Sequence, residues 1–516
     1  MAYDNIPKEK FRLINQGERI SDKKFETKAI GYFQDAFNRF KRNRSSVTAG
    51  IIILLLLAYA IVVPMISNYD VTFRDGYYKT VLPKAEVAFL QNIGWDGCGV
   101  QNEPQAGYDY YGSIGYEYGD SAVKEVREVT VDPNTGKPHY ELYVDSYDKV
   151  GFVYMDLTKD EYEALKAYQN ETGIQVIYPM NANYKIEYKA VNVANLWYQL
   201  EDESALSTGI SKYHDEEGNP IYVHNYRTSA KENAGQYDSL RIPGDDGTAG
   251  ENGDEWFVYA IKNQAGYRVR VVYSEYYNYK NGFYASHLFG TNQHGQDIMV
   301  CLASGARLSF ILSLSVSIIN FCIGVFYGAV EGYYGGLVDL MMERVSDVLA
   351  SVPFVVVATL FQLHLANKVG AVPSLLFAFV MTGWIGIASR VRSQFYRFKH
   401  SEYVMASRTL GASDMRLIFR HILPNSLGTI ITGTVLIIPG VIFSESMLTY
   451  LGIVNLETSG MTSIGTMLAN GRNYLSTFPH VLAFPAGFIA LLEISFNLFG
   501  NGLRDAFNPS LRGADE

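Results

Sequence analysis

Side chains capable of catalysis are scattered through this sequence. Nine His and three Cys are spread over 516 residues, and no pair of Cys has the spacing of a metal site. The nucleophile pattern G-x-S-x-G, the zinc pattern H-E-x-x-H and the phosphate-binding loop G-x-x-x-x-G-K-[ST] are all absent from the sequence. The sequence therefore predicts no catalytic residue, no cofactor and no metal in this chain. A nucleotide that drives the protein would bind to another chain.

One charged stretch stands out because of where it lies. "EYVMASRTLGASDMRLIFRHILPN", residues 402–425, separates two long apolar segments. Helix formers dominate from Tyr403 onward, and Gly411 offers a place where another backbone can come close. Leu410 and Ile418 need an apolar partner. We expect a short helix that docks on a second protein. The alternative is a helix that lies on the membrane ends of its own chain.

The apolar residues that surround this stretch are concentrated in long runs. The chain is 48% hydrophobic and only 19% charged. A helix needs about 20 apolar residues to cross a bilayer. Six runs without Asp, Glu, Lys or Arg reach this length, at residues 45–69, 308–330, 348–367, 369–389, 421–444 and 473–492. The sequence predicts six transmembrane helices.

Basic residues predict the orientation of these helices. Residues 1–48 contain eleven Lys or Arg against six Asp or Glu, and residues 390–421 contain seven against two. Such basic segments remain in the cytoplasm. An even number of spans then places both chain ends inside. The first apolar run starts only near Val47 and is too long for the core of a signal peptide, so we expect an uncleaved anchor.

The segment between the first two spans is long enough to fold by itself. Residues 70–300 contain 35 Asp or Glu against 19 Lys or Arg, which favours a solvated surface, with a docking face for a basic partner as the alternative. The stretches "REVTVDPNTGKPHYELYV" and "KYHDEEGNPIYVH" predict two β-hairpins. "DLTKDEYEALKAYQNETG" predicts one helix with Thr158 as N-cap, Glu161 in a capping box and Gly173 as its end. "RIPGDDGTAGENGDEW" predicts a surface loop, with a calcium site as the alternative. The Tyr-rich stretches "GYDYYGSIGYEYGD" and "YSEYYNYKNGFY" predict strands that pack on each other, with a sugar- or peptide-contact surface as the alternative.

The stretch at 402–425 resembles a known motif. It is similar to the EAA loop of ABC-importer permeases, in the form found in the C-type subunit of the oligopeptide/dipeptide permease family. The resemblance extends over residues 288–512 through "HLFGTNQHGQD", "EGYYGGLVDLMMERVSDV", "WIGIASRVR", "PGVIFSESMLTYLGI" and "SFNLFGNGLRDAFNPSLR".

This resemblance implies a non-catalytic pore subunit with the six-helix type I ABC importer fold. Its expected partners are a B-type permease subunit, two ABC ATPase subunits that carry ATP and Mg²⁺, and an extracellular lipid-anchored peptide-binding protein. The membrane surrounds it, and nucleic acid is not a partner. We expect a multi-pass protein of the cell membrane of a Gram-positive-like bacterium.

Combined with the apolar runs, the resemblance gives a domain map. We expect an α-helical polytopic membrane protein with a β-rich (α+β) extracellular domain between helices 1 and 2. The expected parts are a cytoplasmic segment at 1–47, helix 1 at 48–68, the extracellular domain at 69–300, the permease core at 301–505 with its coupling loop at 390–424, and a cytoplasmic tail at 506–516.

The resemblance also implies roles for particular residues. Those expected to contact an ATPase subunit are Glu402, Tyr403, Ala406, Arg408, Gly411, Ala412 and Ser413. The chain departs from the family pattern at Ser407, where Ala is usual, and at the outer entrance, where Asn292, Gln296 and Cys301 replace charged residues. These losses put the usual gating by charge at the entrance in doubt.

Two acidic residues in the apolar runs are candidates for the translocation path. Glu493 interrupts the last run, and an ionisable group at that depth should face the helix bundle or a wet cavity. It either locks two helices together or contacts a cationic group of the substrate. Glu445, near the outer end of the fifth run, should lie close enough to water to be solvated.

Two other functions remain open at this point. Nickel or another small solute could replace the peptide as cargo of the same class of transporter. A membrane-anchored surface receptor is a more distant alternative, because one span would suffice for an anchor and the coupling stretch would have no role.

Overall fold

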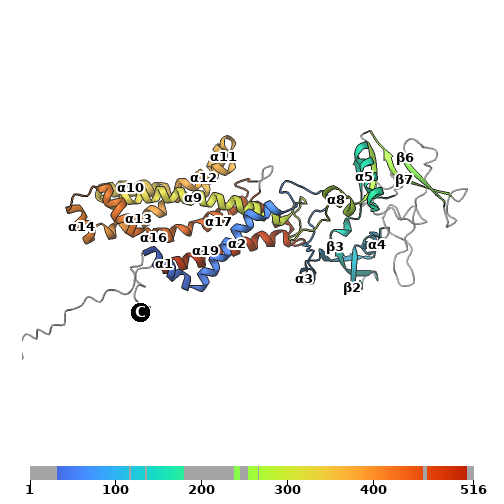
Figure 1. Ribbon diagram of the computed structural model, residues 1–516, viewed down its shortest axis with the longest axis horizontal. Helices are drawn as coiled ribbons and strands as arrows, with labels where there is room; N and C mark the ends of the chain where they lie inside the picture. Colours follow the sequence, from blue (N-terminus) through green and yellow to red (C-terminus); the bar gives the residue numbers. More distant parts are fainter. Residues whose placement is uncertain are drawn as a thin grey trace, which may run out of the picture.

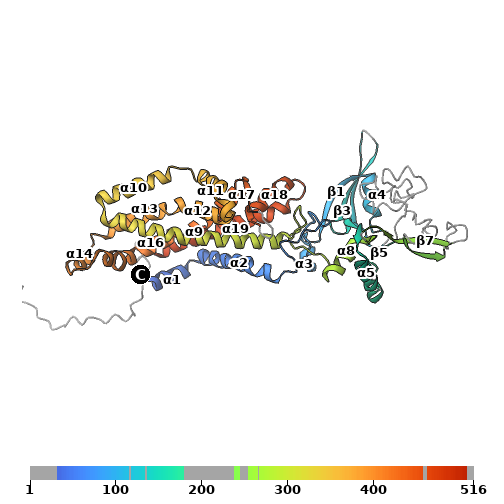
Figure 2. The same cartoon turned by 90° about the horizontal axis from the view of Figure 1, so that it is seen from above.

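The computed structural model describes residues 32–115, 118–133, 136–178, 237–243, 254–264, 266–456 and 462–507. The molecule is elongated, with a long helical bundle at one end and a region with two β-sheets at the other (Figures 1 and 2). The hairpin expected at "KYHDEEGNPIYVH" and most of the acidic loop after Pro243 lie outside the described residues.

The bundle is built from helices on both sides of the β region in the sequence. Its helices are α1 Tyr32–Arg42, α2 Arg44–Ile66, α9 Ile298–Tyr334, α10 Gly336–Ala350, α11 Phe354–Val369, α12 Ala371–Gly383, α13 Ile385–Phe398, α14 Glu402–Thr409, α15 Asp414–Arg416, α16 Leu423–Val435, α17 Ile437–Tyr450, α18 Ile464–Gly471 and α19 His480–Phe507. A π-helical turn at Leu417–Ile422 joins α15 to α16.

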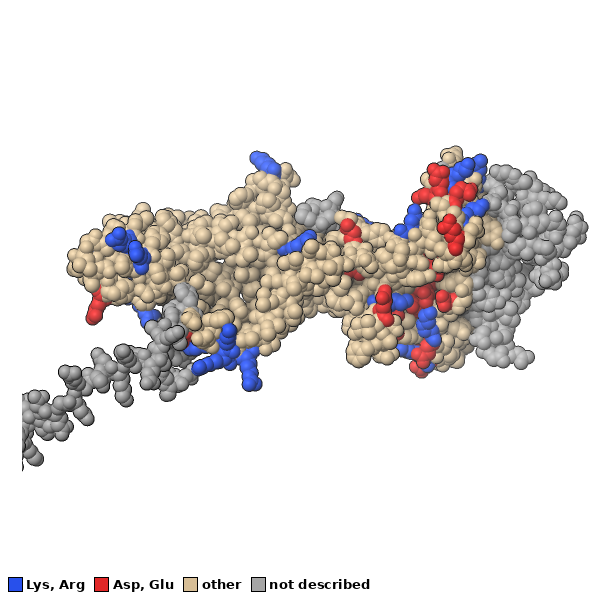
Figure 3. Space-filling model, in the orientation of Figure 1, with Lys and Arg blue, Asp and Glu red and all other residues tan. Residues whose placement is uncertain are grey.

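Six spans agree with the structure when one of them is counted as bent. Five stretches among the described residues are long and apolar enough to cross a membrane, and α10 and α11 together make a sixth that bends by 72°. The five are 44–66, 298–334, 371–398, 414–450 and 480–507. Figure 3 shows charged side chains gathered toward the two ends of this face, with a largely uncharged bundle between them.

The helices extend beyond the charge-free runs because charged side chains ended those runs early. The helix α9 continues past Arg307 and Glu331, and α19 continues past Glu493 to Phe507. The third predicted span, residues 348–367, left out most of α10. The acidic residues of α10 kept it from being part of any charge-free run. The first helix begins at Arg44, behind the N-cap Asn43, and not at 48, and α9 begins at Ile298 and not at 301.

Close approach of backbones holds the centre of the bundle together. The longest helix, α9, packs along α13 through Gly324, Gly328 and Gly332. A Cβ atom at Gly328 would lie 2.2 Å from the carbonyl oxygen of Ala388, so no larger residue fits there. Small residues at helix interfaces are the usual means of tight packing in membranes, where apolar side chains gain little by leaving lipid.

Two antiparallel sheets lie between α2 and α9 in the sequence. The first has the strand order β1-β3-β2, and the second has the order β4-β8-β7-β6 with β5 paired to β8. The strands are β1 Cys98–Pro104, β2 Val123–Val131, β3 Pro138–Asp145, β4 Phe152–Leu157, β5 Ile177–Tyr178, β6 Tyr237–Pro243, β7 Asp254–Lys262 and β8 Tyr267–Val272. Four helices accompany them: α3 Ala88–Gln91, α4 Gln105–Ser113, α5 Lys159–Thr172 and α8 Tyr273–Asn281.

Two local predictions in this region are confirmed. The hairpin predicted around the Pro-Asn-Thr-Gly turn is confirmed, with Val131 opposite Pro138 in the β2–β3 pair. The helix α5 is also confirmed, because Thr158 and Glu161 form the expected capping box and Gly173 ends the helix with φ of 74°.

Tyrosine packing forms the centre of the second sheet region. Tyr78 and Tyr273 are buried, with ring centroids 4.8 Å apart. The Tyr273 hydroxyl donates to Asp75 at 2.6 Å. The predicted packed strands are wrong at the Tyr-rich stretches, because residues 105–113 form the helix α4 and residues 273–281 form the helix α8, and the tyrosines of α8 build this aromatic core from a helix.

A buried polar pair joins the β region to the bundle. His287 Nδ1 lies 2.8 Å from Asp297 Oδ2, and both side chains are buried. The other oxygen of Asp297 accepts a hydrogen bond from the backbone N–H of Val300 and so caps α9. The last segment of the β region is therefore tied to the first turn of the longest helix.

Candidate coupling segment

The coupling segment, which we define as residues 401–422, lies at the end of the bundle away from the sheets (Figures 1 and 2). It contains α14, α15 and the π-helical turn that leads into α16. The coupling loop was predicted at 390–424, but the first residues of that range belong to the helix α13, which ends at Phe398. The segment that stands apart from the long helices is therefore shorter than predicted.

The turn after α14 depends on Gly411. Its φ is +83°, a conformation that costs other residues about 1–2 kcal/mol. No heavy atom lies within 4 Å of the position where a Cβ would stand. The space beside Gly411 is open within the described chain, so the close approach of a partner's backbone stays a prediction. The glycine is needed here for the left-handed turn.

Apolar side chains on the side of the segment that faces the bundle anchor it there. Val404 is fully buried, and it belongs to one cluster with Phe395 of α13 and with Leu417 and Ile418 of the π-helical turn. Ile418 is thus covered by its own chain, as its apolar character requires. The inner side of α14 is fixed in position by this packing.

A polar contact fixes the segment to the end of α9. The hydroxyl of Tyr333 donates to the carboxylate of Asp414. Arg408 Nη2 donates to the oxygen of the same hydroxyl at 3.1 Å. One tyrosine therefore links both sides of the Gly411 turn to the longest helix of the bundle.

The outer side of the segment is exposed and apolar in part. Leu410 is 88% exposed, and Tyr403 and Met405 are exposed beside it. Of the residues predicted to contact an ATPase, the structure exposes Glu402, Tyr403, Ala406, Arg408, Gly411 and Ser413 and half buries Ala412. They follow one another within residues 402–413 of the chain. Sequence reasoning gave no role to Met405, Met415 or Phe419, which are also apolar and exposed in this segment.

An ion cluster near this end also escaped the sequence reasoning. Arg392 of α13 donates two hydrogen bonds to Asp339 and two to Glu343, both in α10. Its Nε also lies 3.5 Å from Glu331 of α9. The sequence signal that could have indicated this cluster is the spacing of Asp339 and Glu343, which lie one helical turn apart. The cluster ties three helices together beside the coupling segment.

Glu445 does not lie where the sequence predicted. It is 1% exposed, and not solvated. Ser309 of α9 donates to its Oε2 at 2.8 Å, and Thr449 donates to its Oε1 at 3.4 Å. The surrounding hydroxyl groups satisfy a carboxyl group that packing of α17 against α9 encloses. Glu445 acts as a link between helices in this structure.

Glu493 is half buried on α19. Among the described residues, its Oε1 is a buried oxygen without a hydrogen-bond partner. The next polar side chain on the same face is Asn497, which is exposed and donates to the Glu493 carbonyl.

Neutral amide groups make the contacts in the turn before α9. Asn292 Nδ2 donates to Gln296 Oε1 at 3.0 Å, and Gln296 Nε2 donates to the carbonyl of Val71 at 2.6 Å. The turn before α9 is therefore held by neutral groups, while Cys301 is buried in the first turns of the helix.

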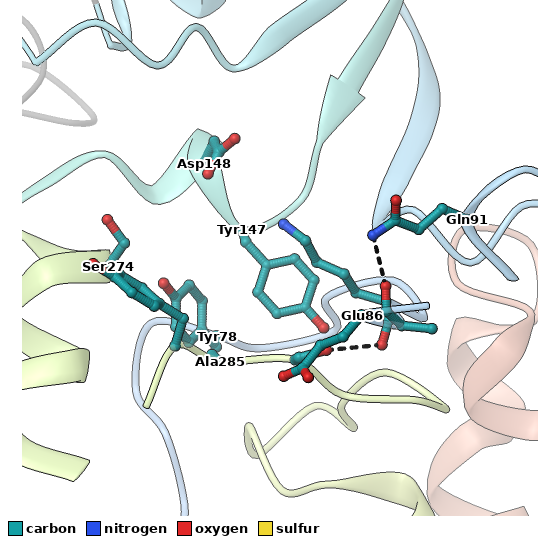
Figure 4. Close-up of a pocket in the computed structure, with 11 residues that line it drawn as sticks. Tyr78, Glu86, Gln91, Tyr147, Asp148, Ser274 and Ala285 are labelled. Atoms are coloured by element: carbon teal, nitrogen blue, oxygen red, sulfur yellow. Dashed lines mark hydrogen bonds between the residues drawn. The ribbon is translucent and has the colours of Figure 1, made fainter. Parts of the chain in front are cut away.

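A small cavity lies between the bundle and the sheets (Figure 4). Its volume is about 260 Å³, and Tyr78, Tyr147, Lys84 and Glu86 are among its lining residues. Burial raises the pKa of the Tyr147 phenol well above its ordinary value. The Lys84 ammonium already donates to Asp145 at 3.1 Å. The cavity is smaller than most ligand pockets, which measure roughly 300–1,000 Å³, and its only lining cation is committed.

Comparison with known proteins identifies the class. Residues 304–513 match the family model described as binding-protein-dependent transport system inner membrane component, and residues 31–83 match the N-terminal TM domain of oligopeptide transport permease C. With its apolar helices, the chain is a multi-pass membrane permease.

Named relatives define the family. The chain is 40% identical over 226 residues to the oligopeptide transport system permease protein OppC of Bacillus subtilis, covering 44% of this chain and 72% of the relative. It is 39% identical over 229 residues to the dipeptide transport system permease protein DppC of the same organism, covering 44% and 70%. A solved inward-facing structure of the MetNI methionine ABC transporter matches 40% of this chain and 97% of its own at 14% identity, with a TM-score of 0.32. The chain belongs to the family of oligopeptide and dipeptide transport system permeases.

Proposed function

We propose that this chain is a pore-forming subunit of an ATP-driven peptide importer and that the coupling segment seats in an ATPase subunit. The observation that carries the proposal is the two-sided character of α14. Its inner side is held by Val404, while Tyr403, Met405 and Leu410 remain exposed on the outer side. An exposed apolar surface on a fixed helix fits a protein partner.

The proposed complex contains the partners that the family pattern implies. They are a B-type permease subunit, two ATPases and an extracellular binding protein that delivers the substrate. ATP and Mg²⁺ bind to the ATPases, where hydrolysis takes place. The chain itself supplies the path, the seat for an ATPase and the helices that move.

Coupling requires that a movement of the coupling segment is transmitted to the transmembrane helices. When the ATPases close, α14 is displaced, and the contacts of Tyr333 transmit that displacement to α9 while the Arg392 cluster transmits it to α10 and α13. The spans then exchange between inward-open and outward-open arrangements, each with a different affinity for the substrate.

The basic segments support a cytoplasmic location for both chain ends and for α14. The sheets then lie outside the cell, where the binding protein would dock. Relatives named for oligopeptides and dipeptides favour peptides as the substrate. A small solute such as nickel would use the same coupling geometry and differ only at the binding protein and the path.

Co-purification tests this function. The full chain, tagged and purified from its native membrane under mild conditions, should retain ATP-hydrolysing subunits, and Leu410→Asp should release them. Asp160→Leu, an exposed change on α5 at the opposite end, is the control and should retain them. Recovery of the wild-type chain without any ATP-hydrolysing subunit would refute the proposal.

A further inference from the structure

An exposed apolar surface lies on the loop around α3, at the junction of the bundle and the sheets. Val87, Phe89 and Ile93 are 59%, 71% and 54% exposed, respectively. All three come from one segment of seven residues, 87–93. Isolated exposed apolar residues are common, but three large ones on one short loop require a cover.

The base of this loop is fixed at a definite level along the bundle. The Trp95 ring lies 6.5 Å from the ring of Phe484, in the first turns of α19. The indole N–H of Trp95 donates to the carbonyl of Leu288 at 2.7 Å, and the backbone N–H of Ala85 donates to the carbonyl of Trp95 at 2.9 Å. Both views of the ribbon diagram show α3 at the end of the bundle that lies next to the sheets (Figures 1 and 2).

That level coincides with the end of the membrane-spanning helices. The span α19 begins at His480, and α2 ends at Ile66, where Met65 and Ile66 are 75% and 73% exposed. The apolar surface that α2 presents to lipid thus continues to the same end of the bundle. Tryptophan is enriched at this depth because its ring is apolar and its N–H is polar.

We infer that Val87, Phe89 and Ile93 enter the interfacial layer of the leaflet next to the β-sheets and anchor the β region to the membrane surface. The polar neighbours Glu86, Gln91 and Asn92 are exposed on the same loop and can remain among water and headgroups. Apolar side chains of an interfacial segment reach roughly 5–10 Å into the boundary between headgroups and acyl chains. The inference requires only that α2 and α19 cross the bilayer, so it does not depend on the direction of transport.

Such an anchor would orient the sheets relative to the bundle. Glu86, Tyr147 and Lys84 line the neighbouring cavity, so a loop held in the lipid surface also fixes one wall of it (Figure 4). The loop around α3 would be held both by the bundle, through Trp95, and by the lipid surface. The β region would then present the same face to a delivering protein each time.

Spin-label accessibility tests the anchor. In the full chain with its three cysteines replaced by serine, Phe89→Cys is labelled with a nitroxide and reconstituted in nanodiscs of phosphatidylcholine and phosphatidylglycerol, alone and in the purified transporter. Asp160→Cys on α5 is the water-exposed control. We expect the ratio of collision rates with oxygen and with a water-soluble nickel chelate to be severalfold higher at residue 89 than at residue 160, in both preparations.

Two results would overturn the inference. If residue 89 collides with the nickel chelate as often as residue 160, the loop lies in water. If residue 89 loses collisions with both reagents only in the assembled transporter, another protein covers the loop in place of lipid. A labelled Val87→Cys variant provides a second position, so a folding defect at residue 89 alone cannot decide the outcome.

Discussion

Arg408 Nη2 lies 3.1 Å from the hydroxyl oxygen of Tyr333, which joins the coupling segment to the end of α9. The same hydroxyl donates to Asp414 on the far side of the Gly411 turn. A displacement of α14 therefore cannot occur without a force on α9. In the proposed complex, this small network would connect the ATPase-binding segment to the spans.

Tyr333→Phe should weaken coupling while the chain still assembles. The change removes one hydrogen bond to Asp414 and the acceptor for Arg408, with a cost of about 1.5–3 kcal/mol for bonds to charged groups. Tyr334→Phe is the matched control, because Tyr334 is exposed. Substrate-stimulated ATP hydrolysis by the reconstituted complex is the measurement. Equal stimulation in wild type and Tyr333→Phe would show that the network does not carry the movement.

Substitutions at Gly411 should separate the two explanations for this glycine. Because φ is +83°, Gly411→Asn should keep uptake, since Asn tolerates the left-handed region, whereas Gly411→Val should lose most of it. Peptide uptake in cells and chain abundance in the membrane are measured together. If Asn is as damaging as Val while abundance is normal, close contact with a partner, and not the backbone conformation, makes Gly411 necessary.

Removing Arg392 should destabilise the bundle. Arg392→Met leaves Glu331 and Asp339, which are buried or nearly so, without their cation, and we expect a loss of roughly 3 kcal/mol. Arg344→Met breaks an exposed pair with Asp347 and should cost under about 0.5 kcal/mol. Thermal unfolding in detergent compares the two. Similar losses for both variants would argue against a structural role for the cluster.

Glu493 and Glu445 should respond differently to neutralisation. If Glu493 lines the path, Glu493→Gln should assemble normally and lose uptake of cationic substrates more than of neutral ones. Glu445→Leu should reduce assembly itself, because it leaves the buried Ser309 hydroxyl without its acceptor, whereas the Thr449 hydroxyl still donates to the backbone carbonyl of residue 445. Competition between a lysine-containing peptide and a neutral peptide gives the comparison. Equal loss of both substrates at Glu493→Gln would leave only a structural role for this residue.

Cysteine labelling in intact cells should establish the orientation. Burial, with Asp145 and Asp96 nearby, raises the pKa of the Cys98 thiol to about 12, so little reactive thiolate exists at pH 8. A membrane-impermeant maleimide should label Asp160→Cys from outside and Leu410→Cys only after permeabilisation. Labelling of Leu410→Cys in sealed cells would show that residue 410 lies outside the cell, opposite to the proposed topology.

The sequence predicted the local elements well because their signals are local. Thr158, Glu161 and Gly173 alone specify the ends of α5. The motif at 402–425 likewise identified the coupling segment. Its inner and outer sides could not be distinguished in advance, since Ile418 is covered by α13 and Leu410 by nothing within the described chain.

Features that depend on contacts between distant segments were not predictable. Glu445 is enclosed by Ser309, which lies in another helix far away in the sequence. The Arg392 cluster joins three helices, and charges in α10 concealed that helix from a search for uncharged runs. Helix ends were displaced for the same reason, because hydrogen bonding continues past single charged side chains.

Crosslinking at Leu410 tests the central claim most directly. A photoreactive phenylalanine analogue at residue 410 of the full chain, activated in living cells, should join the chain to an ATP-hydrolysing subunit identified by mass spectrometry, while the same analogue at residue 160 should not. Crosslinks at residue 410 to lipid or to other chains, without an ATP-hydrolysing subunit, would contradict the proposed function of the coupling segment.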